Sequence, residues 1–114
     1  NMNIYDCLKK DHDKVKSLLS DLLTVPKDNK ARAKELIEEI RDELIPHSRA
    51  EEAVFYNAIR AAHQDSEVMH GYKEHLEAET LLRTLQFIDK VGVDWKATTL
   101  KLKKALEHHI QEEE

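Results

Sequence analysis

The chain has 114 residues, of which 40% are apolar and 36% are charged, and its formal net charge is −5 at pH 7. This length fits one domain, residues 1–114, and the apolar fraction is large enough to form a core. Acidic and basic residues are interspersed rather than gathered into a basic face, which argues against nucleic-acid binding. No apolar run approaches the roughly 20 residues that span a bilayer, and no signal peptide is visible. The single Cys7 cannot form an internal disulfide, so we expect a cytoplasmic protein without a membrane anchor.

The first two predicted helices follow from apolar residues repeating with a 3.6-residue period. The first covers Ile4–Leu23 and ends in the turn 25–29, because Pro26 cannot continue the hydrogen-bond ladder. The second runs from Lys30 to Ala62. Pro46 lies inside this second span, so we expect a bend or a division there.

Two further helices complete the prediction. The third begins with Asp65 or Ser66 as its N-cap and ends near 91–92, where Gly92 suits the position after a helix. The fourth follows the N-cap Asp94 and continues to the end of the chain. Short connections favour antiparallel neighbours. The sequence therefore predicts an all-α, up-down-up-down antiparallel four-helix bundle, with its second helix bent near Pro46.

An internal repeat relates the two halves of the chain. A shift of 63 residues aligns the first helix with the third, and a shift of 62 residues aligns the second with the fourth. Each half then reads as a helical hairpin, with one histidine on its first helix and a His-x-x-x-Glu motif on its second. The aligned pairs are His12 with His75, His47 with His109, and Glu51 with Glu113.

The repeated histidines and glutamates are predicted to meet inside the bundle. The helical rise of about 1.5 Å per residue brings all four histidines toward the same end, and their spacing from neighbouring apolar residues places them on the inward faces. Each glutamate follows its histidine by one helical turn on the same face. Buried carboxylates and imidazoles are destabilising unless they have partners. Two metal cations would provide those partners, since imidazole and carboxylate groups both bind transition metals.

The remaining polar residues fit simpler interpretations. A lone inward histidine is usually a hydrogen-bonded core residue, so the metal hypothesis depends on the coincidence of six candidates. We expect His63 to be a solvated loop residue and His108 to face solvent or a neighbouring helix. His70 lies about 140° around its helix from His75 and is expected outside the ligand set. An acidic rim or an outer layer around the site is expected from Glu52, Glu112 and Glu114.

The combined pattern resembles the hemerythrin-like, or HHE cation-binding, domain family over essentially the whole chain. The resemblance implies two iron ions joined by an oxo or hydroxo bridge, for which zinc or manganese can substitute. It implies bridging roles for the two glutamates and terminal roles for the four histidines. The implied metal ligands are His12, His47, Glu51, His75, His109 and Glu113.

The chain departs from oxygen-carrying hemerythrins at two positions. Their fifth histidine, one turn before the ligand of the third helix, is replaced here by Gly71. Their final His-x-x-x-x-Asp motif is replaced by the shorter spacing from His109 to Glu113. Gly71 would leave space beside one metal for water, oxygen, peroxide or nitric oxide.

Three functional hypotheses follow. The first is a non-haem di-iron protein that binds or senses O₂, peroxide or nitric oxide at an open iron position. The second is a di-iron enzyme or iron donor in oxidative or nitrosative stress defence, acting in peroxide breakdown or iron–sulfur cluster repair. The third is a helical interaction module with incidental histidines. A protein partner or homo-oligomer would supply any signalling output.

Overall fold

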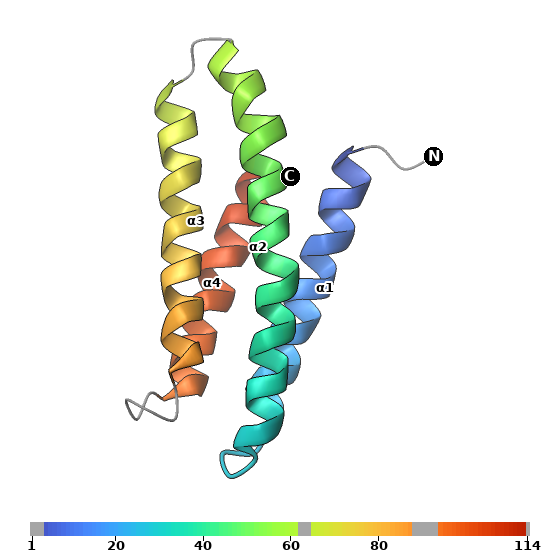
Figure 1. The fold of residues 1–114 in the computed structure, drawn as a ribbon, viewed down its shortest axis with the longest axis vertical. Helices are drawn as coiled ribbons and strands as arrows, with labels where there is room; N and C mark the ends of the chain where they lie inside the picture. The colour runs from blue at the N-terminus through green and yellow to red at the C-terminus, as the bar shows by residue number, and fades with distance from the viewer. Residues whose placement is uncertain (1–3, 62–64, 88–93, 114) are drawn as a thin grey trace.

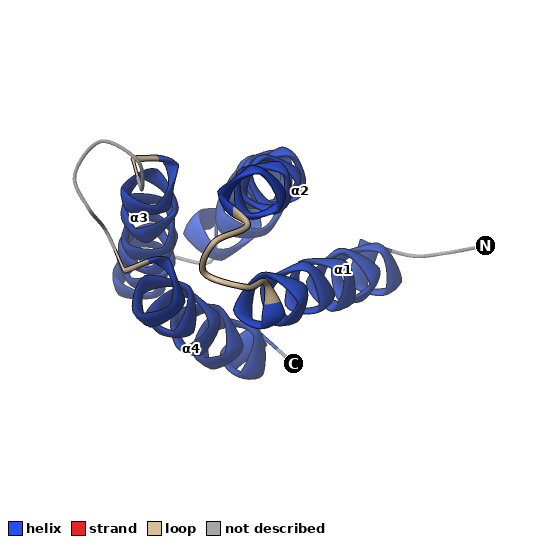
Figure 2. Cartoon of the chain, turned by 90° about the horizontal axis from the view of Figure 1, so that it is seen from below, coloured by secondary structure: helices blue, strands red, loops and turns tan. Residues whose placement is uncertain are grey.

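The computed structural model describes residues 4–61, 65–87 and 94–113, which form four helices (Figure 1). Each helix contacts its two neighbours around a common core, and Figure 2 shows the four helices surrounding that core. Successive helices run in opposite directions, so the predicted up-down-up-down all-α bundle is confirmed. The helices are α1 (Ile4–Thr24), α2 (Lys30–Ala61), α3 (Asp65–Gln86) and α4 (Trp95–Glu113).

Side chains fix the start of two helices. The side-chain oxygen of Asp94 accepts hydrogen bonds from the backbone N–H groups of Lys96 and Ala97, at 3.1 and 3.2 Å, which confirms Asp94 as the N-cap of α4. Asn29 plays the same part for α2, because its Oδ1 accepts a hydrogen bond from the backbone N–H of Arg32 at 3.3 Å. The turn after α1 therefore also defines the start of the next helix.

One of the two alternatives predicted at Pro46 does not occur, and one helix ends earlier than predicted. α2 is not divided at Pro46 but continues through it as one helix of 32 residues, which curves gently in Figure 1. Pro46 lacks the N–H that would donate one turn back in the helix, and the buried residues before it, Leu36, Ile37, Ile40 and Leu44, pack in the core. α3 ends at Gln86, earlier than the predicted end near 91–92, in a tight turn where the Phe87 N–H donates to the Thr84 carbonyl at 3.1 Å. Residues 88–93 and the predicted helix 2 terminus, Ala62, lie outside the described ranges.

The apolar core fills the end of the bundle that carries the α1–α2 connection. In α1 and α3 the buried apolar residues come after the repeat histidine in the sequence. In α2 and α4 they come before it. Ile110 is the single exception among the described buried side chains. The core comprises Val15, Leu19, Leu22, Val25, Ala33, Leu36, Ile37, Ile40, Leu44, Ala78, Leu82, Leu85, Trp95, Leu102, Leu106 and Ile110. The predicted histidine layer therefore lies next to the part of the apolar core formed by the described side chains.

No helix in the described parts of the chain combines the length and apolar character needed to cross a bilayer.

Leu102 and Leu100 on α4 provide a direct test of this core. Leu102 is fully buried, whereas Leu100 is 43% exposed. We expect Leu102→Ala to lower the free energy of unfolding by about 2–5 kcal/mol, because it removes packed methyl groups and leaves a cavity. Leu100→Ala should change it by about 1 kcal/mol or less. Urea denaturation of the two variants measures both values, and equal losses would contradict the assigned orientation of α4.

Candidate metal centre

Four histidines and one glutamate form a buried polar layer across the bundle. α1 contributes His12, α2 contributes His47 and Glu51, α3 contributes His75, and α4 contributes His109. Their exposed fractions are only 5, 7, 3, 4 and 8%, in that order. The structure thus brings together five of the six residues that the sequence singled out.

These residues form two groups that share Glu51. Within each group the candidate ligand atoms all lie within 4.8 Å of one another. We call His12, His47 and Glu51 the first half-site, and Glu51, His75 and His109 the second half-site. Each half-site therefore combines two imidazoles with one carboxylate, a donor set that suits iron, zinc or manganese.

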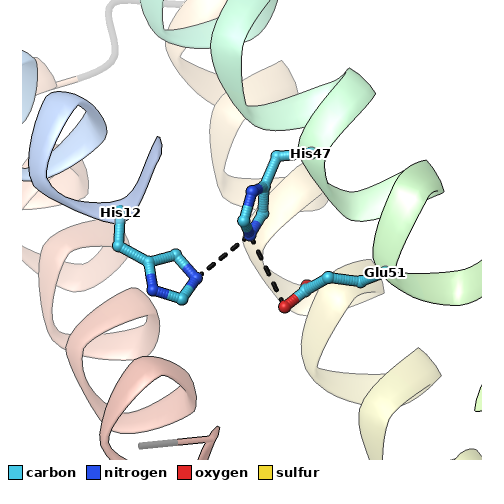
Figure 3. A group of neighbouring side chains, drawn as sticks. All are labelled: His12, His47 and Glu51. Atoms are coloured by element: carbon cyan, nitrogen blue, oxygen red, sulfur yellow. Dashed lines mark hydrogen bonds and ion pairs between the residues drawn. The ribbon is translucent and has the colours of Figure 1, made fainter. Parts of the chain in front are cut away.

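In the first half-site the two imidazole rings present the same nitrogen to each other. Figure 3 shows the Nε2 atoms of His12 and His47 3.0 Å apart, with Oε2 of Glu51 3.5 Å from the latter. Two nitrogen ligands about 2.0–2.1 Å from one metal, at roughly a right angle, stand about 3 Å apart. The spacing of these nitrogens fits joint coordination of one cation.

The other oxygen of Glu51 faces the second half-site. Its Oε1 lies 2.9 Å from Nε2 of His75 and 3.4 Å from Nε2 of His109. The two oxygens of one carboxylate are thus directed toward different pairs of histidines, as in a carboxylate that bridges two cations.

The internal repeat is preserved in the geometry of the histidine pairs. The rings of His12 and His47 have centroids 4.7 Å apart and an interplanar angle of 65°. The rings of His75 and His109 have centroids 4.9 Å apart and an angle of 68°. Each helical hairpin therefore supplies the same edge-to-face imidazole pair.

Three of the histidines are held by a carboxylate on their outer side. The Nδ1 of His47 donates to Asp11 at 3.2 Å, that of His75 donates to Glu52 at 2.6 Å, and that of His109 donates to Glu74 at 2.8 Å. Because an ionised carboxylate only accepts hydrogen bonds, Nδ1 of each of these rings carries a proton. The Nε2 atom faces the centre of the layer, as in a histidine metal ligand whose other nitrogen is held by a carboxylate.

The electrostatics of His47 favour positive charge at this position. Burial is the largest single influence and lowers the pKa of His47, but the hydrogen bonds and charges of Glu51 and Asp11 together raise it above its usual value. Glu51 and Asp11 therefore favour the protonated form of His47 despite its burial.

A cavity of about 20 Å³ lies between the half-sites and has room for about one water-sized group. Small side chains, Ala78 from α3 and Ala105 from α4, help to leave this space, and Leu44, Ser48 and Leu106 line it beside the histidines. The cavity therefore has both apolar side chains and the histidines of the two half-sites on its lining.

The other candidates from the sequence are not brought into the two half-sites. His70 is 56% exposed, with its Nε2 3.5 Å from Oε2 of Glu74, and His108 is 66% exposed, 3.8 Å from the same oxygen. Both therefore contact the outer carboxylate and not Glu51. The side chain of Glu113 and all of His63 lie outside the described part of the chain.

Sequence reasoning did not single out Asp11 and Glu74, and it left Glu52 between a solvated rim and an outer layer. A signal existed, because the repeat aligns Asp11-His12 with Glu74-His75. A residue just before an inward histidine is rotated by about 100° and can thus reach the neighbouring helix. In both hairpins this acidic residue contacts the histidine of the partner helix.

Comparison with known proteins agrees with this arrangement. The hemerythrin HHE cation-binding domain family matches residues 3–114. The chain is also 27% identical over 114 residues to a DNA nickase of Nostoc sp. (strain PCC 7120 / SAG 25.82 / UTEX 2576), covering all of this chain and 32% of that protein. The chain thus spans about a third of the length of this relative. No solved structure gives a significant match.

The orientation of the imidazoles can be tested by NMR of the metal-free protein labelled with ¹⁵N-histidine. We expect Nδ1 of His47, His75 and His109 to carry a proton, because each of these atoms donates to a carboxylate. His108, which is 66% exposed, provides the comparison for a solvent-exposed ring. Buried rings that lack a proton on Nδ1 would contradict these hydrogen bonds.

Proposed function

Because the chain belongs to the hemerythrin HHE cation-binding domain family, we propose that it holds two iron ions between its helices and binds or senses small oxidants. These small oxidants are O₂, peroxide and nitric oxide. The observation that carries the proposal is the carboxylate of Glu51, which faces histidine Nε2 atoms from α2, α3 and α4.

The charge balance of the layer supports a cation in each half-site. A hydrogen bond to an outer carboxylate occupies Nδ1 of His75 and turns its Nε2 toward the negatively charged Oε1 of Glu51, 2.9 Å away. Lone pairs and carboxylate oxygens repel one another in a buried, low-dielectric environment unless positive charge lies between them. A divalent or trivalent cation in each half-site supplies that charge and uses every inward donor.

We assign the ligands by half-site. His12 and His47 would hold one cation, His75 and His109 the other, and Glu51 would bridge the two. Glu113 is proposed as the second bridging carboxylate because the repeat aligns it with Glu51. Bound iron would supply reversible cycling between Fe(II) and Fe(III).

The exchangeable position is proposed beside Gly71. This residue is buried in α3, one turn before His75 and on the same helical face. A side chain at position 71 would point toward the second half-site, and glycine leaves that space to a small ligand. Ala78 and Ala105 keep the neighbouring walls small and apolar.

The name of the Nostoc relative does not change this proposal. That name describes a protein of which this chain matches 32%. The net charge of −5 offers no electrostatic attraction to DNA.

The proposed centre is tested by metal content and visible absorption after anaerobic loading with Fe(II) and exposure to air. We expect about two irons per chain, with absorption bands from an oxo-bridged pair. His109→Ala should lose both iron and the bands because it removes a buried donor from the second half-site. His108→Ala is the matched control, since the adjacent residue is 66% exposed, and it should retain both.

Two other outcomes would change the interpretation. Failure of the loaded wild-type protein to retain any iron would rule out the di-iron centre. Retention of iron with rapid peroxide turnover, lost in Glu113→Ala, would favour the enzyme over the binding protein.

A further inference from the structure

We infer that the two half-sites are unequal, and that the second half-site takes up its cation first and holds it more tightly. This inference rests on the proposed function and adds an order of loading, together with the residues that set it. The difference arises outside the ligands, in the groups that orient the histidines.

The outer carboxylates of the second half-site are the more buried ones. The side chains of Glu52 and Glu74 are 14 and 12% exposed and lie 2.6 and 2.8 Å from the histidines they orient. In the first half-site, Asp11 is 44% exposed and lies 3.2 Å from His47. Water competes with the longer, exposed contact far more than with the two short, buried ones.

Arg49 fixes one of the buried carboxylates in place. Its Nη1 donates to both oxygens of Glu52, at 3.2 and 2.9 Å. Its guanidinium also donates to both oxygens of Glu79 on α3, at 2.6 and 3.3 Å. Glu79 is itself buried, with an exposed fraction of 7%. A guanidinium held by two carboxylates has a defined direction, so Glu52 is kept against His75.

The repeat does not reproduce this support around the first half-site. The shift of 62 residues aligns Arg49 with Gln111, and the shift of 63 aligns Glu79 with Lys16. A neutral amide and an ammonium group cannot form the same fork between two helices. Glu114, which aligns with Glu52, lies outside the described residues, but the sequence provides no arginine at the position that would hold it.

These contacts affect metal affinity through the histidines. A carboxylate on Nδ1 fixes the ring and makes Nε2 a more basic donor, and loss of such a partner typically weakens metal binding about 10–100-fold. In the matched pair of contacts, the buried Glu74 holds His109 at 2.8 Å, whereas Asp11, 44% exposed, holds His47 at 3.2 Å. The histidine rings of the second half-site therefore lose less conformational freedom when the cation binds.

Zinc is a suitable probe because it is diamagnetic and has no redox chemistry. Metal-free protein labelled with ¹⁵N-histidine is titrated with Zn²⁺, and the imidazole signals are followed by NMR. We expect His75 and His109 to respond at the first equivalent, and His12 and His47 at the second. Competition with a chelator measures the two stepwise binding constants.

Matched variants identify the cause of the difference. Glu52→Ala should weaken the first step about 10–100-fold and leave the second nearly unchanged, whereas Asp11→Ala should affect the second step alone. Arg49→Gln should weaken the first step by a smaller factor and broaden the His75 signals. Arg32→Gln removes the same charge from an exposed pair with Glu35 on α2 and should change neither step.

The outcomes separate this inference from the proposed function. Zinc binding with a response of His12 and His47 first, or of all four rings together, would overturn the order of loading and leave the metal centre standing. Loss of the second step in Glu52→Ala would also overturn it. If no zinc binds, both the metal centre and the order fail.

Discussion

The carboxylate of Glu51 is the constraint on which the rest of the site depends. It is 97% buried, with an exposed fraction of 3%, in a bundle whose core is otherwise largely apolar. A buried carboxylate is strongly destabilising unless charge and hydrogen bonds compensate it. The compensation comes from histidines on three helices, and outer carboxylates in turn hold three of the four buried histidines. The need to compensate the charge of Glu51 thus accounts for the histidines around it and for the carboxylates behind those histidines.

Periodicity and repetition made much of this arrangement predictable. The apolar period located all four helices, and the repeat identified His12, His47, His75, His109 and Glu51 before their geometry was known. Each of these residues lies on the inward stripe of a helix, where the position is set by local spacing alone. The end of α3 was mispredicted because Gly92 suggested a later stop, whereas the chain turns at Phe87. The place of Glu113 among the ligands remains a prediction.

The outer groups were harder to predict for a physical reason. Whether Glu52 lies in solvent or against His75 depends on how α2 and α3 are rotated about their axes and how closely they approach. The sequence gives neither quantity. The same holds for Arg49 and Glu79, which are 30 residues apart and meet only through helix packing. Such contacts between helices make the two half-sites different, although the sequence repeat alone would predict them to be equivalent.

The shared position of Glu51 also has a consequence for folding kinetics. The histidine pair of the first hairpin joins residues 35 apart, while Glu51 contacts His109 across 58 residues and between the two hairpins. Each hairpin can pair its own helices early, but the contacts of Glu51 with α3 and α4 form only once the hairpins dock. Long-range contacts of this kind slow folding, because the cost of closing the loop comes before the contact is gained. A cation held there would stabilise the docked bundle relative to two undocked hairpins.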